Sequence, residues 1–119
     1  MSKLFSIKRG DTLPKVKGQL FSDSANTSPV DLTTAETVKF KMGPAGQSGT
    51  LTVDREVQVI DAAEGRWEIQ LTAIETNTQG QFEAEIEVAW DDQRVNVTTY
   101  PKEDFISVTV FRDLDGPES

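Results

Sequence analysis

The stretch Phe82-Glu83-Ala84-Glu85-Ile86-Glu87-Val88-Ala89-Trp90 alternates apolar and acidic side chains. In an extended chain, successive side chains point to opposite faces, so Phe82, Ile86 and Trp90 share one face and the glutamates share the other. A helix would distribute the same charges around its axis. At about 3.3 Å per residue, the stretch would run roughly 30 Å, the height of a small sandwich. It therefore predicts a long β-strand with one buried and one wet face.

Shorter segments with the same alternation lie on both sides of this strand, and turn-forming residues separate them. Thr72-Ala73-Ile74-Glu75 has the spacing of a capping box and predicts one helical turn before Gly80. Regularly spaced short strands are typical of two packed sheets. We therefore expect an all-β fold, an antiparallel β-sandwich of about eight or nine strands with one short helical turn. The expected short strands include 16–20, 38–42, 51–53, 57–59, 67–71, 95–97 and 106–110.

A length of 119 residues predicts a single domain, residues 1–119, with enough core to fold without staples. Residues 1–9 are expected to form either a first strand or an N-terminal arm. Residues 112–119 are expected to form a polar C-terminal tail. The N-terminus has no long apolar run typical of a secretory signal, and no stretch approaches the ~20 apolar residues of a membrane span. We therefore expect a protein made in the cytoplasm, with no membrane partner.

The composition argues against most catalytic chemistry. The chain has no cysteine and no histidine, which removes the thiolate nucleophile, the usual base near neutral pH and the commonest metal ligands. We therefore expect no enzyme and no cofactor. The net charge of −8 argues against nucleic acid, because phosphate binding needs a basic footprint.

The charge is also unevenly distributed along the chain. Residues 1–41 hold seven basic and four acidic side chains, whereas residues 42–119 hold five basic and sixteen acidic ones. A basic patch that faces an acidic patch can orient neighbouring subunits. An ordinary solvated surface is the alternative.

Several short motifs are better explained as turns or core. Arg9-Gly10-Asp11 matches an adhesion tripeptide, and Asn26 and Asn96 begin glycosylation sequons, but these need an exported chain. Acidic pairs such as Asp91-Asp92, Glu103-Asp104 and Asp113/Asp115 lack the dense spacing of a calcium loop.

The side chains of the long strand also have a structural explanation. Glycoside hydrolysis requires two carboxyl groups that converge across a cleft, whereas Glu83, Glu85 and Glu87 would point in parallel. Trp67 and Trp90 are in phase with the inward residues, so core packing is favoured over sugar stacking.

The order of six segments resembles a known family. Gly10-Asp11-Thr12-Leu13-Pro14 leads a strand, and Pro29-Val30-Asp31-Leu32-Thr33 precedes Val38–Met42. Val59–Arg66, Gly80–Val88 and Tyr100-Pro101 follow. Over about residues 10–111, the chain resembles the N-terminal domain of bacteriophage baseplate upper proteins and the small tail proteins related to it.

This resemblance implies an immunoglobulin-like sandwich that assembles with other virion proteins and with copies of itself, and it implies no catalytic residues. In longer relatives the domain anchors the protein to the baseplate core, and later domains hold the receptor-binding protein. Because the chain stops at Ser119, we expect a small structural component of the tail tip or baseplate. The alternatives are a capsid decoration protein and a carbohydrate-binding module of the host-recognition apparatus. The residues expected to contact neighbouring proteins are Leu4, Phe5, Ile7, Phe111 and Leu114.

Overall fold

The computed structural model describes residues 3–23, 25, 27–47, 49–101 and 105–112. Together they form nine β-strands and one short 3-10 helix, in agreement with the all-β prediction. The strands are β1 (Lys3–Lys8), β2 (Val16–Gln19), β3 (Thr37–Pro44), β4 (Val53–Glu56), β5 (Gln58–Asp61), β6 (Arg66–Ile69), β7 (Gly80–Ala89), β8 (Val97–Tyr100) and β9 (Ile106–Phe111). The 3-10 helix η1 covers Ala62–Glu64.

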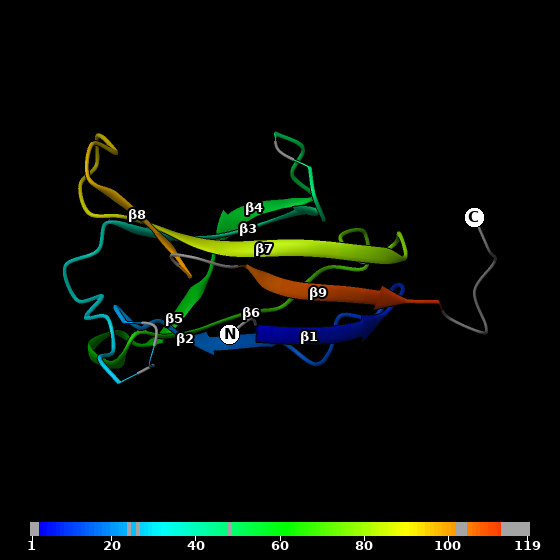
Figure 1. The fold of residues 1–119 in the computed structure, drawn as a ribbon, viewed down its shortest axis with the longest axis horizontal. Coiled ribbons are helices and arrows are strands. Elements are labelled where there is room, and N and C mark those ends of the chain that lie inside the picture. Colours follow the sequence, from blue (N-terminus) through cyan, green and yellow to red (C-terminus); the bar gives the residue numbers. More distant parts are fainter. Residues whose placement is uncertain (1–2, 24, 26, 48, 102–104, 113–119) are drawn as a thin grey trace.

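Two sheets pack face to face (Figure 1). The larger sheet has the order β1-β9-β7-β3-β4, and β8 also pairs with β7. The smaller sheet has the order β2-β6-β5. Within the larger sheet, β1 runs parallel to β9, and every other pairing is antiparallel. The chain passes from the larger sheet to the smaller one between β4 and β5.

Strand β7 is the centre of the larger sheet, as its alternating sequence predicts. Its first half pairs with β9 and its second half with β8, while β3 runs along its other side. Its inward residues are no more than 6% exposed, and the glutamates face outward. Because β3 and β9 supply alternating residues in matching register, this face of the sheet is continuously apolar across the three strands. The buried residues on β7 are Phe82, Ala84, Ile86 and Val88.

The core lies between the two sheets. Phe40 on β3 and Trp67 on β6 contact each other across this space, with ring centroids 5.9 Å apart and planes tilted by 45°. Ile86 and Val108 are fully buried beside them. Trp67 is 3% exposed, so the sequence prediction that it belongs to the core is confirmed. Trp90 is half-buried against the same cluster.

Several short segments differ from the expected strand boundaries. Leu51 is 48% exposed and lies before β4, which begins at Val53. Val57 lies in the passage between the sheets, and Val59 is 38% exposed because β5 is an edge strand. Val95 is 73% exposed and lies in the turn before β8. Alternation over two or three residues does not distinguish a strand from a turn that borders one.

The helical turn also lies elsewhere than expected. The 3-10 helix forms at Ala62–Glu64 and ends at Gly65, whose φ of 69° suits glycine. A Cβ on Gly65 would also lie 2.7 Å from the carbonyl oxygen of Val30. At Thr72 the expected capping-box bonds do form, since the Thr72 amide donates to Glu75 and the Glu75 amide donates to the Thr72 hydroxyl. These bonds stabilise a turn between β6 and β7.

Candidate protein-interaction surfaces

The five residues expected at an interface have different environments. Leu4 is 82% exposed on β1, and Phe111 is 52% exposed at the end of β9. Phe5 is partly buried against the core, and Ile7 is 4% exposed and belongs to it. Leu114 lies outside the described residues. The alternation of side chains along β1 explains why these residues differ in exposure, because Phe5 and Ile7 face the smaller sheet while Leu4 faces outward.

The outward face of β1 and β9 differs from that of β7 in having no glutamates. In the parallel register, Leu4 lies beside Ser107, Ser6 beside Thr109, and Lys8 beside Phe111. The described residues of these two strands include no acidic side chain. Phe105, just before β9, is 42% exposed. The sequence did not single out the acid-free character of this face, because it arises from two strands about 100 residues apart.

Two of the three glutamates on the outward face of β7, Glu83 and Glu87, have partners among neighbouring cations and amides. Lys41 Nζ lies 3.1 Å from Glu87, and Arg94 also pairs with Glu87. Burial raises the pKa of Glu87, but the hydrogen bonds from Arg94 and Lys41 outweigh it and hold the pKa below its ordinary value. Glu83 accepts a hydrogen bond from the amide of Gly46 at 3.0 Å. These glutamates are half-buried under their partners rather than open to water, and they do not converge on a cleft.

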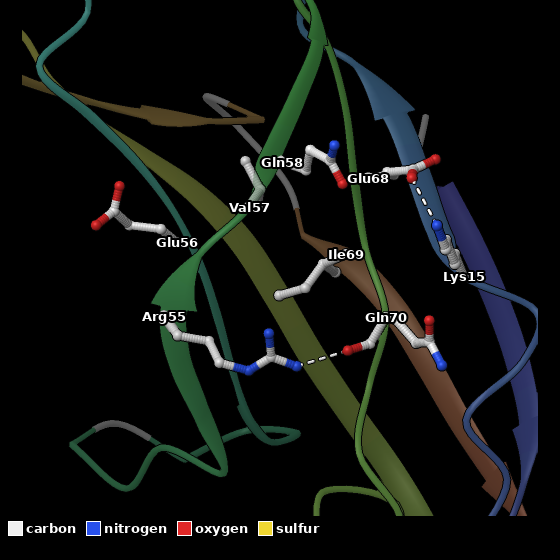
Figure 2. A pocket seen from close by; sticks show the side chains of 8 residues that line it. All are labelled: Lys15, Arg55, Glu56, Val57, Gln58, Glu68, Ile69 and Gln70. Carbon is white, nitrogen blue, oxygen red and sulfur yellow. Dashed lines mark hydrogen bonds and ion pairs between the residues drawn. The ribbon is translucent and has the colours of Figure 1, made fainter.

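A groove of about 450 Å³ opens where β4 leaves the larger sheet and β5 joins the smaller one (Figure 2). Lys15 Nζ and Glu68 form an ion pair at 2.9 Å on one side of it. On the other side, Arg55 Nη2 donates to the carbonyl oxygen of Gln70 at 2.7 Å. Gln70 lies just beyond β6, where β5 no longer runs beside the chain. The guanidinium of Arg55 therefore provides the hydrogen bond to the Gln70 carbonyl oxygen. The lining residues are Lys15, Arg55, Glu56, Val57, Gln58, Glu68, Ile69 and Gln70.

Arg55 also joins β4 to the connection between β6 and β7 through Glu75. Its Nε and Nη2 atoms lie 2.9 and 2.7 Å from the two carboxylate oxygens of Glu75. Burial raises the pKa of Glu75, but the bonds from Arg55 and Thr72 together hold the pKa below its ordinary value. Three of the four charged side chains that line this groove, those of Lys15, Arg55 and Glu68, are thus paired within the chain.

The aromatic residues do not form a flat exposed platform. Trp67 and Tyr100 are 3% and 6% exposed, and Trp90 Nε1 donates to the hydroxyl of Thr98 at 3.2 Å. The exposed aromatic rings among the described residues are Phe105 and Phe111, one at each end of β9. Exposed rings without a polar handle are more typical of protein contacts than of sugar stacking.

The aspartates in two acidic turns accept hydrogen bonds from backbone amides of the same turn. Asp91 accepts hydrogen bonds from the amides of Val95 and Asn96, and Asp23 accepts from the amides of Thr27 and Ser28. These bonds lower the pKa of each carboxyl, with the Val95 amide contributing most at Asp91 and the Thr27 hydroxyl at Asp23. Over the residues that the structure describes, no three acidic side chains gather as a metal site would require. Within the same residues, no helix has the length and apolar character to cross a membrane.

The described residues thus form a β-sandwich with edge strands, exposed apolar side chains and several internally paired charges. Residues 17–100, most of the chain, match the family described as the BppU N-terminal domain. The chain therefore belongs to the N-terminal domain family of phage baseplate upper proteins, as the resemblance implied. A search of curated proteins gives no match.

Family membership indicates a structural protein of the phage baseplate. Such a protein associates with other virion proteins and is located in the tail or baseplate of the particle. The family also suggests a structural rather than an enzymatic role.

Proposed function

We propose that this protein is an assembly component of the tail tip or baseplate of a tailed phage, and that it acts by binding alone. The observation that carries the proposal is the family match over residues 17–100. The geometry supports it, because the described surface offers free strand edges and exposed apolar side chains instead of a reactive site. In this role the rigid sandwich would present its edges and end loops to neighbouring proteins, and symmetry would multiply weak contacts.

An immunoglobulin-like arrangement is part of this proposal. If β2 to β7 are taken as strands B, C, C′, D, E and F, and β9 as strand G, the sheets have the orders G-F-C-C′ and B-E-D. These are the neighbour orders of a variable-type immunoglobulin sandwich. The domain is proposed to comprise the whole chain, with β1 as an integral strand rather than a free arm.

The proposed partners are other virion proteins and further copies of this chain. Leu4 and Phe111 are the expected contact residues that lie on the surface, whereas Ile7 contributes to the core. A net charge of −8 supports the proposal that nucleic acid is not a partner. Synthesis in the cytoplasm of the bacterial host, before assembly, completes the proposal.

Fractionation of phage particles tests this function. Particles that carry a tagged copy would be separated into heads and tails, and each fraction would be probed for the tag and examined by electron microscopy. We expect the tag in the tail fraction, at the tail end distal to the head. A tag in the head fraction would indicate a capsid decoration protein instead. Absence from both fractions would contradict any role in the virion.

A further inference from the structure

The two edges of the larger sheet differ in charge. Among the described residues, no strand pairs with the outer side of β1 or with the outer side of β4. β1 contains lysines and no acidic residue, and Lys8 is exposed on its outward face. β4 places Asp54 and Glu56 on the same outward face of the sheet. One sheet therefore ends in a basic edge on one side and an acidic edge on the other.

These charges distinguish between the possible edge pairings. A free strand edge is a template for another strand, and lysines on an edge discourage pairing between like edges. Two β1 edges would offer Lys8 no acidic partner, and two β4 edges would bring carboxylates together. Like charges on neighbouring strands destabilise a sheet, whereas opposite charges stabilise it. The combination that the charges favour is β1 of one copy with β4 of another.

The strand directions favour the same combination. β1 runs parallel to β9, and the following pairings β9-β7, β7-β3 and β3-β4 are all antiparallel. Three reversals mean that β1 and β4 run in opposite directions. A second copy in the same orientation as the first would therefore present β4 antiparallel to β1, with both smaller sheets on the same side. Because a β-sheet twists from strand to strand, the second copy would be turned about the axis that crosses the strands, but neither copy would have to rearrange.

We propose that the outer edge of β1 pairs with the outer edge of β4 in a second copy of this chain, so that copies join head to tail in one continuous sheet. Such a heterologous contact forms a ring if the rotation between copies closes, and a filament if it does not. This inference deepens the proposed self-association and rests on it, but inclusion in the virion does not require it.

Full overlap of the two edges, with the outward faces of both copies on the same side, defines a register. It places Leu4 opposite Glu56 of the second copy and Ser6 opposite Asp54 of the second copy. The aliphatic part of Glu56 would then cover Leu4, which is 82% exposed in the single chain. Lys8 would lie diagonally across from Asp54, within reach of its long side chain.

The same diagonal geometry already occurs twice within the larger sheet. Lys41 lies opposite Glu85 but pairs with Glu87 at 3.1 Å. Lys39 lies opposite Glu56 but approaches Asp54 to 3.7 Å. Lysines of this sheet thus reach the acid two residues along the neighbouring strand, as the proposed pairing requires of Lys8.

Cross-linking between single-cysteine variants tests the pairing, because the chain has no cysteine of its own. A Leu4→Cys copy and a Glu56→Cys copy that carry tags of different mass would be mixed and treated with a short bifunctional thiol reagent. Both positions are exposed, so neither change disturbs the core. We expect mixed dimers well above the level given by a Gln93→Cys copy with the Glu56→Cys copy, since Gln93 is exposed in the turn before β8.

A charge reversal provides the second measurement. Lys8→Glu in the Leu4→Cys copy is expected to lower the rate of mixed cross-linking by about two- to fivefold, the equivalent of one cross-strand charge pair. Dimers between two Leu4→Cys copies would show β1-β1 pairing and overturn the proposal. A mixed yield equal to the Gln93→Cys control would also overturn it. If the tagged chain still enters tails in either case, the proposed function stands without this contact.

Discussion

The guanidinium of Arg55 on β4 forms two hydrogen bonds with the carboxylate of Glu75, which lies 20 residues further along the chain between β6 and β7. The pair joins the edge of the larger sheet to the connection that leaves the smaller one. Nearby, Thr76 is fully buried, and its hydroxyl donates to the carbonyl oxygen of Asp11 at 2.9 Å, just beyond β1. The β6–β7 connection is thus bonded to both edges of the larger sheet. Glu75 bonds to Arg55 within β4, and Thr76 bonds to Asp11 just after β1.

Glu75→Gln is expected to destabilise the fold. The substitution keeps the shape of the side chain but removes the negative charge of the carboxylate, which accepts hydrogen bonds from Arg55 and from the Thr72 amide. Loss of a charge-assisted hydrogen bond in a partly buried place costs about 1–3 kcal/mol of unfolding free energy. Urea unfolding at neutral pH measures this. Glu64→Gln is the matched control, since Glu64 is exposed on η1, and an equal loss in both variants would contradict the expected role of the pair.

Stability is expected to fall as the pH is lowered below about 4.5, near the ordinary glutamate pKa. Glu75 and Glu87 both have folded-state pKa values held below that ordinary value. Each carboxylate therefore favours the folded state above the unfolded-state pKa, and this contribution is lost as the pH falls through the folded-state pKa. Urea unfolding between pH 7 and pH 3 follows the change. The Glu75→Gln/Glu87→Gln double variant should show a shallower dependence, and an unchanged slope would show that other carboxyls dominate acid unfolding.

Gly18→Ala is expected to destabilise the smaller sheet. Gly18 on β2 lies opposite Trp67 on β6, and a Cβ at this position would lie 2.7 Å from the indole carbon Cζ2. Overpacking of this kind costs about 1–3 kcal/mol, because the buried indole has little space in which to move. Thermal unfolding with tryptophan fluorescence reports both stability and the indole environment. Lys17→Ala is the control on the same strand, and a loss as large as that of Gly18→Ala would mean that strand propensity rather than contact is responsible.

Neighbouring positions on β7 should respond very differently to alanine. Ile86 is fully buried, and Ile86→Ala is expected to cost about 2–5 kcal/mol through lost burial and a residual cavity. Glu85 is half-buried on the outward face, and Glu85→Ala is expected to cost less than about 1 kcal/mol. Chemical unfolding of both variants gives the comparison. Similar losses at both positions would contradict the assignment of inward and outward faces.

The alternating segments determined much of this protein by themselves. The period of two in Phe82–Trp90 fixed β7, its buried face and the acidic character of its other face, since side-chain direction along a strand is a local property. The same reasoning placed Trp67, Ile69 and Val108 in the core, and the capping-box spacing placed the Thr72–Glu75 bonds. Short edge segments such as 51–53 and 57–59 were predicted less well, because a pattern of two apolar residues carries little information on where pairing ends.

Only the tertiary structure decided which segments became neighbours. The parallel pairing of β1 with β9 made Lys3–Lys8 an edge strand, and that placement put Ile7 in the core and left Leu4 on the surface. The pairing of Arg55 with Glu75 and of Lys15 with Glu68 likewise joins residues 20 and 53 positions apart. Such contacts depend on the order of strands in each sheet, and that order follows from the packing of the whole chain rather than from any local pattern.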